Sequence, residues 1–430
     1  MPLSAIDSSR QAALELYESA PVPTWRRSGF WTTSLRTLKL EELGPKTYAP
    51  VASRTDLPEV VREALGDQPL AGLVVLHGGS VILTEISDEA SAAGVVVSSL
   101  EDAFENNFEI AQAHYAKRIG HDEGKFSAAN AALWTGGAFV YVPKNTAVEL
   151  PIQVVNVITD PGTAQYARTL VVVDQGATAY VREYNVAPPL EGQALHGGAL
   201  EVFVGDTANV KLVSLHDWQS GEIFDISTKR VQIGRDAHCS WFPIHLGAHL
   251  TKQTLDIITA EEGADMRHNG IFFTEGDEHL DLYSTDLHEK GHTTGDTVWK
   301  GVMTGRSRAS YEGLIEIVEG AQGTNTYLQT HSVMLSPHAK VDAIPSLIVK
   351  TDDVSASHGG TVGEIDEDQV FYMRCRGISR QQAIQVLVEG FFEPIVAKLD
   401  DAPLETLVRA RIGEKLDAAK DDIAAYAASK

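Results

Sequence analysis

One short pattern recurs through the middle of this chain and restricts its fold more than any other feature. A run of alternating apolar residues is followed by a polar or glycine turn, a small residue and a second alternating apolar run. Because alternation with a period of two is typical of β-strands, each copy predicts a strand, a bend and a second strand. The clearest copies span residues 140–150, 171–181, 202–212 and 231–241, and weaker ones follow at 315–327, 333–343 and 347–357.

Imperfect repetition of one strand–bend unit is typical of a solenoid, in which each copy buries its apolar side chains against a stacked neighbour. The early copies begin about 30 residues apart and the later ones about 15 apart, so one coil is expected to hold two copies. A β-sandwich would also contain short alternating strands joined by turns. The Ala or Gly residues at matching places in the copies favour the solenoid.

The segments on either side of the repeats have different patterns. Apolar spacing predicts helices over residues 1–20 and 100–118, with a hairpin at 73–83 between them. After the repeats, Ser379 and Gln382 form a capping box, and the apolar residues that follow recur at helical spacing. The sequence therefore predicts a mainly β protein with three domains: an α+β region at 1–125, a β core at 126–356 and a helical region at 357–430.

The charge of the chain restricts its partners. The formal net charge is −24, from 35 basic and 59 acidic side chains. A surface this acidic repels nucleic-acid phosphates and anionic lipid, so neither nucleic acid nor a membrane is an expected partner. We find no apolar stretch long enough to span a bilayer and no signal peptide, and we expect a cytoplasmic protein.

The chain has only two cysteines, Cys239 and Cys375. Two thiols are too few for a disulfide framework, which fits a reducing compartment. They are also too few to hold an iron–sulfur cluster, which usually needs about four thiolates. Cys239 alternates with His238 in a repeat, so one of the two should face the core, while Cys375 is expected to be a buried, inert thiol.

Histidines are frequent between residues 216 and 338, and they raise the question of a metal site. His245 and His249 are four residues apart, but the local pattern indicates a strand rather than a helix. His279, His288 and His292 lie among acidic residues, as solvated loop histidines do. A metal-dependent cupin-like enzyme that uses these histidines is one alternative function, and a carbohydrate-active β-helix enzyme is another.

His358 has a different context, because it follows the last repeat, precedes two glycines and lies just before the helical region. A neutral imidazole there could bind iron or transfer a proton. The alternative is a histidine that hydrogen-bonds a turn, and residue chemistry alone favours this alternative.

Several motifs occur in the order found in one family. Residues 21–27 and 31–36 have its Pro-and-Trp opening, and residues 126–144 resemble its entry into a β-helix. Residues 357–363, SHGGTVG, and 371–378, FYMRCRGI, are similar to the family motifs S-H-G-A-T-x-G and F-Y-L-x-S-R-G-I. This combination resembles the SufB/SufD family, the scaffold subunits of the Suf iron–sulfur cluster assembly system, and it is more similar to SufD than to SufB.

The resemblance implies a right-handed parallel β-helix core with α-helical N- and C-terminal regions. It also implies a non-catalytic scaffold subunit of a SufBCD complex, paired with a SufB-like paralogue, with a homodimer as the alternative when the chain is alone. The C-terminal helices would dock the SufC ATPase. The residues that match the docking motif are Phe371, Tyr372, Arg374, Arg376 and Gly377.

The resemblance further implies that His358 lies at the SufB interface, acts with a SufB cysteine on the nascent cluster and is the metal contact of this chain. In SufB that cysteine corresponds roughly to Thr330, and a Cys often found in SufD is replaced here by Ala356. Gly360 replaces the usual Ala of the motif. No cofactor is expected on the chain alone, a transient iron–sulfur cluster would be shared with SufB, and a flavin would belong to the assembled complex.

Overall fold

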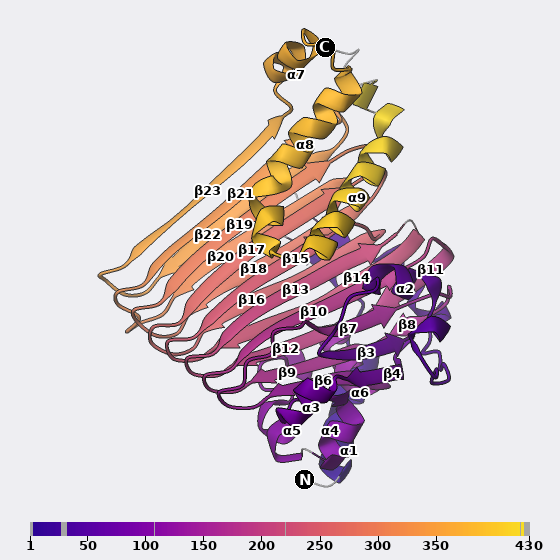
Figure 1. The fold of residues 1–430 in the computed structure, drawn as a ribbon, viewed down its shortest axis with the longest axis vertical. Helices are drawn as coiled ribbons and strands as arrows, with labels where there is room; N and C mark the ends of the chain where they lie inside the picture. The colour runs from indigo at the N-terminus through magenta and orange to yellow at the C-terminus, as the bar shows by residue number, and fades with distance from the viewer. Residues whose placement is uncertain (1–2, 27–31, 107, 220, 422, 425–430) are drawn as a thin grey trace.

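Parallel strands stack along the length of the molecule, with helices at both ends (Figure 1). This arrangement comes from a computed structural model, which describes residues 3–424 except 27–31, 107, 220 and 422. The strands form a mainly β solenoid of about eight turns, as the repeats predicted. No helix in these described ranges is both long and apolar enough to cross a membrane.

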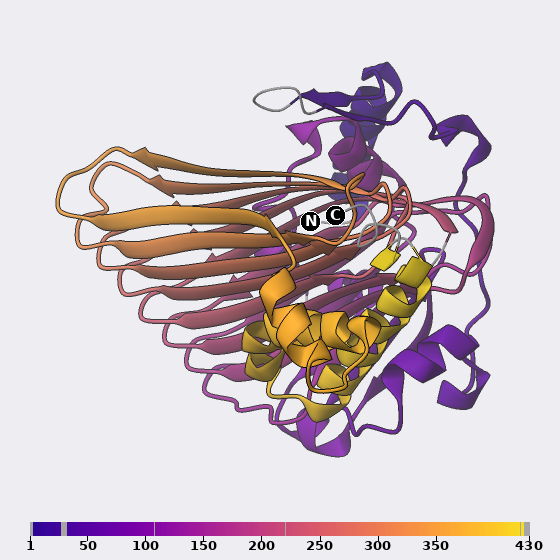
Figure 2. The same cartoon turned by 90° about the horizontal axis from the view of Figure 1, so that it is seen from above.

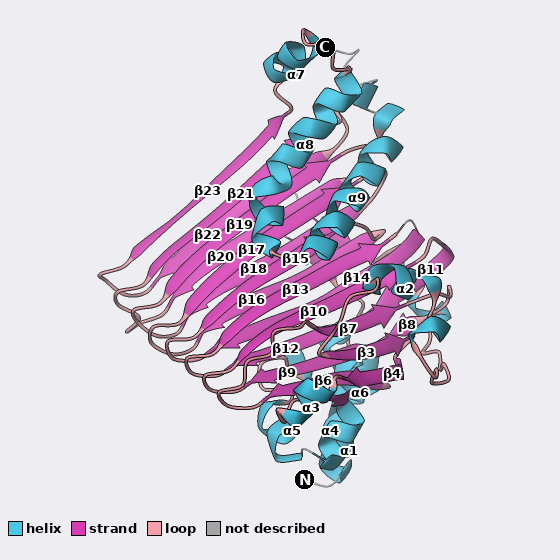
Figure 3. Ribbon diagram, in the orientation of Figure 1, coloured by secondary structure: helices cyan, strands magenta, loops and turns pink. Residues whose placement is uncertain are grey.

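Two sheets make up the two long walls of the solenoid, and nearly all of their pairings are parallel (Figure 3). The first sheet has the order β23 (Ser355–Glu364), β21 (Asn325–Met334), β19 (Thr294–Met303), β17 (Asp265–Thr274), β15 (His238–His245), β13 (Asn209–Trp218), β10 (Thr178–Ala187), β7 (Ile152–Val157), β3 (Gly72–His77) and β4 (Ser80–Ile86). The second has the order β22 (Lys340–Val349), β20 (Arg308–Ile317), β18 (His279–His288), β16 (Leu250–Thr259), β14 (Gly221–Ile233), β12 (Ala199–Val204), β9 (Ala167–Val173), β6 (Gly136–Val142) and β5 (Val96–Ser99). Short strands β8 (Ala164–Gln165) and β11 (Leu190–His196) extend it, and β1 (Thr24–Arg26) pairs with β2 (Thr32–Ser34).

Each coil contains one strand from each sheet and therefore two bends. The copies at 315–327, 333–343 and 347–357 lie across successive bends, as the expected two copies per coil require. In three of the four clear copies, 171–181, 202–212 and 231–241, the small residue lies at the same bend, where the chain passes from the second sheet to the first. It is fully or almost fully buried there, because the next coil stacks directly on it. These alanines are Ala177, Ala208 and Ala237, and Ala264 occupies the equivalent place in the next coil. In the first clear copy, by contrast, Ala147 is exposed.

The N-terminal region caps the first coils. Its helices are α1 (Leu3–Ser19), α2 (Glu59–Leu65), α3 (Asp88–Ala92), α4 (Leu100–Asn106), α5 (Phe108–His114) and α6 (Lys125–Leu133), and β3 and β4 form the expected antiparallel hairpin. The helix predicted over 100–118 is two shorter helices. The second ends at His114 because the Glu201 carboxylate accepts main-chain N–H groups of the next turn, from Ala116, Arg118 and Ile119.

The C-terminal helices are α7 (Glu367–Arg374), α8 (Arg380–Val396) and α9 (Ala402–Ala418). The predicted capping box of Ser379 and Gln382 opens α8. Helices α8 and α9 lie across the outer face of the first sheet, whereas α7 projects beyond the last strand (Figure 1). Their apolar faces share one buried cluster with the outer residues of that sheet, which holds the two helices against the solenoid.

Two expectations about the junction with this region are corrected. Residues 357–363 belong to β23, which runs to Glu364, so His358 lies within a strand rather than in a turn. Cys375 is exposed, not buried, and it is the C-cap residue of α7, which projects beyond the last strand.

Candidate functional site

A column of polar side chains runs along the inner face of the first sheet. In-register residues of parallel strands point to the same side, so side chains stack from coil to coil. The Asn156 Nδ2 donates to Asn185 Oδ1 over 2.9 Å, and the next two coils place His216 and His245 in the same column. The two imidazoles stack with their centroids 4.7 Å apart.

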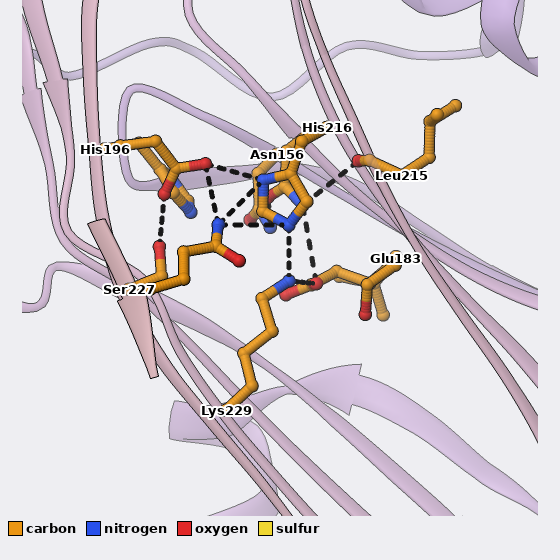
Figure 4. A network of polar contacts seen from close by, with 12 residues as sticks. Asn156, Glu183, His196, Leu215, His216, Ser227 and Lys229 are labelled. Carbon is orange, nitrogen blue, oxygen red and sulfur yellow. Dashed lines mark hydrogen bonds and ion pairs between the residues drawn. The ribbon is translucent and has the colours of Figure 1, made fainter. Parts of the chain in front are cut away.

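The second sheet presents complementary groups to this column. Residues 225, 227 and 229 alternate along β14, so all three point inward. Asp225 lies 2.6 Å from His216 Nδ1, and Lys229 Nζ lies 2.8 Å from His216 Nε2 and forms an ion pair with Glu183 (Figure 4). A continuous series of side-chain contacts therefore crosses the interior, from Asp225 through His216 and Lys229 to Glu183.

Further donors fix the position of the Asp225 carboxylate. Trp218 Nε1 and Ser227 Oγ donate to it over 2.7 and 2.5 Å, and the Gln253 amide donates over 3.0 Å. Burial alone would raise the Asp225 pKa, but His216, His196 and the Ser227 hydroxyl outweigh burial and hold it well below its usual value. Asp225 is therefore an ionised carboxylate in the centre of the solenoid.

Protonation of the other groups follows from the same contacts. Burial, together with Lys229, lowers the pKa of His216, so this imidazole is neutral. Its single proton belongs on Nδ1, which donates to Asp225, and its Nε2 accepts from Lys229. Burial would raise the Glu183 pKa, but the Lys229 ammonium and His216 lower it below its usual value. The network therefore joins two ionised buried carboxylates through a neutral imidazole and the Lys229 side chain.

Buried polar atoms continue beyond the network toward the last coils. Both ring nitrogens of His245 and of His268 have no hydrogen-bond partner in the described part of the chain, nor do Asp286 Oδ1 and the Trp299 indole nitrogen. The Thr330 hydroxyl extends this set into β21. Because unpaired buried polar atoms are costly, the interior is expected to contain water that satisfies them.

This network could not be recognised from the sequence. Its residues lie at alternate positions of strands, and polar residues with a period of two normally mark the solvent face. His288 was also expected in a solvated loop, but it is fully buried, and burial lowers its pKa to about 4. His292 is exposed, as predicted. Cys239, rather than His238, faces the core, and burial raises its pKa to about 12.

His358 lies on the inner side of the last strand of the first sheet. Its in-register neighbour, Leu328, is fully buried in the core, but β23 is the end strand of its sheet in the described part of the chain, so His358 is exposed at the open end of the solenoid. Thr330 lies on the same inner face and pairs with Gly360. Thr330 and His358 thus lie on adjacent strands, and Thr330 is the position that corresponds to the SufB cysteine in the resemblance.

The residues expected to dock an ATPase lie on α7 and just after it. Phe371 and Tyr372 are 66% and 58% exposed, which is unusual for large aromatic side chains. The Arg376 guanidinium stacks over the Tyr372 ring, 4.5 Å from its centroid. Gly377 has a φ of 86°, in the left-handed region where it ends the helical segment.

Comparison with known protein families identifies the family to which this chain belongs. Residues 3–154 match the SufBD protein N-terminal region, and residues 156–391 match the SufBD core domain of the SUF system for FeS cluster assembly. The chain belongs to the SufBD family. It is 27% identical over 412 residues to the "Iron-sulfur cluster assembly protein SufB" of Bacillus subtilis, which covers 93% of this chain and 86% of that protein. An "Iron-sulfur cluster assembly SufBD family protein" of Staphylococcus epidermidis is 26% identical with the same coverage.

Membership of the SufBD family identifies the chain as an iron–sulfur cluster assembly protein. The names of these relatives do not separate SufB from SufD. The alternative of a cupin-like or carbohydrate-active enzyme is not favoured. In the described residues, no three His, Cys, Asp or Glu side chains form a group that could hold a metal ion.

Proposed function

We propose that this chain is the SufD-like subunit of a SufBCD-type scaffold for iron–sulfur cluster assembly and transfer. The observation that carries the proposal is His358, an exposed imidazole on the inner face of the last strand. Its neighbours there, Thr330 and Ala356, offer no thiolate. A cluster that is built at this end would need cysteines from another subunit. The cluster is then cargo shared with a SufB-like partner, and a flavin would belong to the assembled complex.

The open end of the solenoid supports the partner assignment. Strands β22 and β23 are edge strands, whose unpaired main-chain groups are available to another chain. Large apolar side chains are exposed on these last coils, as expected of a surface that a second subunit covers. They are Tyr327, Leu347, Ile348, Val349 and Val362. We propose that a SufB-like paralogue binds here, and that a homodimer uses the same surface when the chain is alone.

We also propose that α7 and the start of α8 dock the SufC ATPase. Phe371 and Tyr372 provide the apolar contact, and Arg374, Arg376 and Gly377 complete the motif. The chain itself would supply no catalytic group, and the ATPase partner would supply the energy. The assembly would work in the cytoplasm.

Co-purification tests the docking proposal. Phe371→Ala together with Tyr372→Ala should abolish SufC binding, because the pair supplies most of the apolar area of α7. Val22→Ala is the matched control, since Val22 is 47% exposed but belongs to the N-terminal region. If the double variant retains SufC as the control does, the assignment of α7 is wrong.

A second experiment tests His358. The His358→Ala variant should still form the complex but should yield less cluster in cells, because only the imidazole is lost from an exposed site. Ser357→Ala, an exposed neighbour on the opposite face of β23, should leave cluster yield unchanged. Unchanged yield with the His358 variant would count against its role in cluster formation.

A further inference from the structure

A pocket of about 620 Å³ lies beside the outer face of the second sheet, where the N-terminal segment stops covering it. Ser34 of β2 contributes to one wall of this pocket. The opposite wall includes His279, Arg308 and Lys340, which are in register at the starts of β18, β20 and β22. Figure 2 shows the N-terminal segment, in indigo, lying against one side of the strand stack.

The type of residue at this in-register position changes where the N-terminal segment no longer covers the sheet. Leu250, on the preceding strand, is buried, and His279 is half-buried with its Nε2 2.9 Å from the Thr33 hydroxyl. Arg308 and Lys340 follow and are exposed. The covered positions thus carry an apolar side chain and an imidazole, whereas the two positions that line the open pocket carry fixed positive charges.

These two cations lack the partners that other cations of this acidic chain have. Exposed Arg235 pairs with two glutamates, and Lys350 pairs with Glu316 over 2.6 Å. Within the described ranges, by contrast, neither the Arg308 guanidinium nor the Lys340 ammonium has a hydrogen bond or an ion pair. The pocket therefore concentrates uncompensated positive charge on adjacent strands, which lie about 4.8 Å apart.

The other polar groups of the pocket leave this charge available. Its carboxylate, Asp277, is engaged by Arg306, with an Nε–Oδ1 distance of 3.4 Å. The Ser34 hydroxyl has no hydrogen-bond partner among the residues that the structure describes. A ligand in this pocket would thus meet two free cations on one wall and a free hydroxyl on the other.

We propose that this pocket binds a small phosphate-bearing anion. Two cations on adjacent strands can contact separate oxygens of one phosphate, and the guanidinium can contact two of them at once. The cavity volume lies in the range of small-molecule sites. Salt screens the distant acidic residues beyond about 10 Å, so they do not repel a small anion, whereas they do repel an extended polyanion. This site goes beyond the proposed scaffold function and does not depend on it.

Calorimetric titration of the purified full chain tests the proposal, with inorganic phosphate and ADP as probes. Both should bind, and phosphate should compete with ADP for the same site. Arg308→Gln and Lys340→Gln should each weaken binding by about tenfold or more, because each removes a charge-assisted hydrogen bond. A higher affinity for ADP than for phosphate would support a ligand of nucleotide size.

Lys350→Gln is the matched control, because it removes the same charge just beyond the other end of β22, outside the pocket. It should leave both affinities unchanged, and all three variants should melt like the parent chain. The proposal is overturned if neither probe binds at millimolar concentration, or if Lys350→Gln weakens binding as much as Lys340→Gln does. In that case the basic residues serve only to keep an edge strand soluble.

Discussion

The ion pair between Lys229 and Glu183 offers a direct test of how the interior is held together. Their side chains are only 2% and 5% exposed, and they come from opposite sheets. Lys229→Met keeps the length of the side chain but leaves the Glu183 carboxylate buried without its cation. Breaking a buried pair in this way costs about 3–5 kcal/mol of unfolding free energy.

The expected shift in melting temperature follows from the size of the unfolding unit. A cooperative domain of 150–250 residues loses roughly 2–4 °C per kcal/mol, and the strand stack is of this size, so the melting temperature should fall by roughly 6–20 °C. Differential scanning calorimetry of the isolated chain measures this shift. Lys144→Met, at an exposed turn, is the control and should change the free energy by less than about 0.5 kcal/mol.

A double-mutant cycle separates the pair from simple loss of packing. Glu183→Gln combined with Lys229→Met removes both charges, so the double variant should be less destabilised than the sum of the two single variants. The expected coupling is about 1–3 kcal/mol. Additive effects, or a shift below roughly 2 °C for Lys229→Met, would refute the argument that the buried charges depend on each other.

Three further predictions concern packing, pH and a helix end. Gly301→Ala should destabilise the stack by about 1–3 kcal/mol in thermal melts, since the added Cβ would lie 1.9 Å from the Phe272 ring. Adding Phe272→Leu to this variant should recover part of the loss, and an unchanged melt for Gly301→Ala would contradict this close contact. Burial raises the Glu278 pKa to about 7 despite Lys415. The contribution of Glu278 to stability is therefore complete below its unfolded pKa near 4.5 and is lost as pH rises through 7. Between pH 5 and 8 the melting temperature should decline more steeply for the parent than for Glu278→Gln, and parallel curves would exclude this group as the cause. Gly377→Ala should cost about 1 kcal/mol or more at a φ of 86°, which should be seen as faster amide hydrogen exchange in α7, whereas unchanged exchange would argue against a left-handed requirement.

The sequence was sufficient to predict the solenoid and two strand–bend copies in each coil. Strand periodicity is local, and the small residue at each bend marks the place where coils stack, so Ala177 and Ala208 are buried as the repeats required. The capping box of Ser379 and Gln382 likewise predicted the start of α8, because capping depends on residues three positions apart. The structure of residues 357–363 was harder to predict from the sequence, since glycines allow both a turn and the strand that the structure contains.

The candidate site depended on tertiary structure. A period of two places alternate residues on opposite faces but does not say which face is inside, so Glu183 and Lys229 resemble solvent-facing residues in the sequence. Only the fold brings these two residues, 46 positions apart, into contact across the interior. Family motifs singled out His358, but its place on the inner face follows from its register with the buried Leu328. The sequence by itself thus determined the coil, because strand and bend preferences are local. The tertiary structure decided which polar groups are buried together, because a buried charge is stable only where another strand supplies its partner.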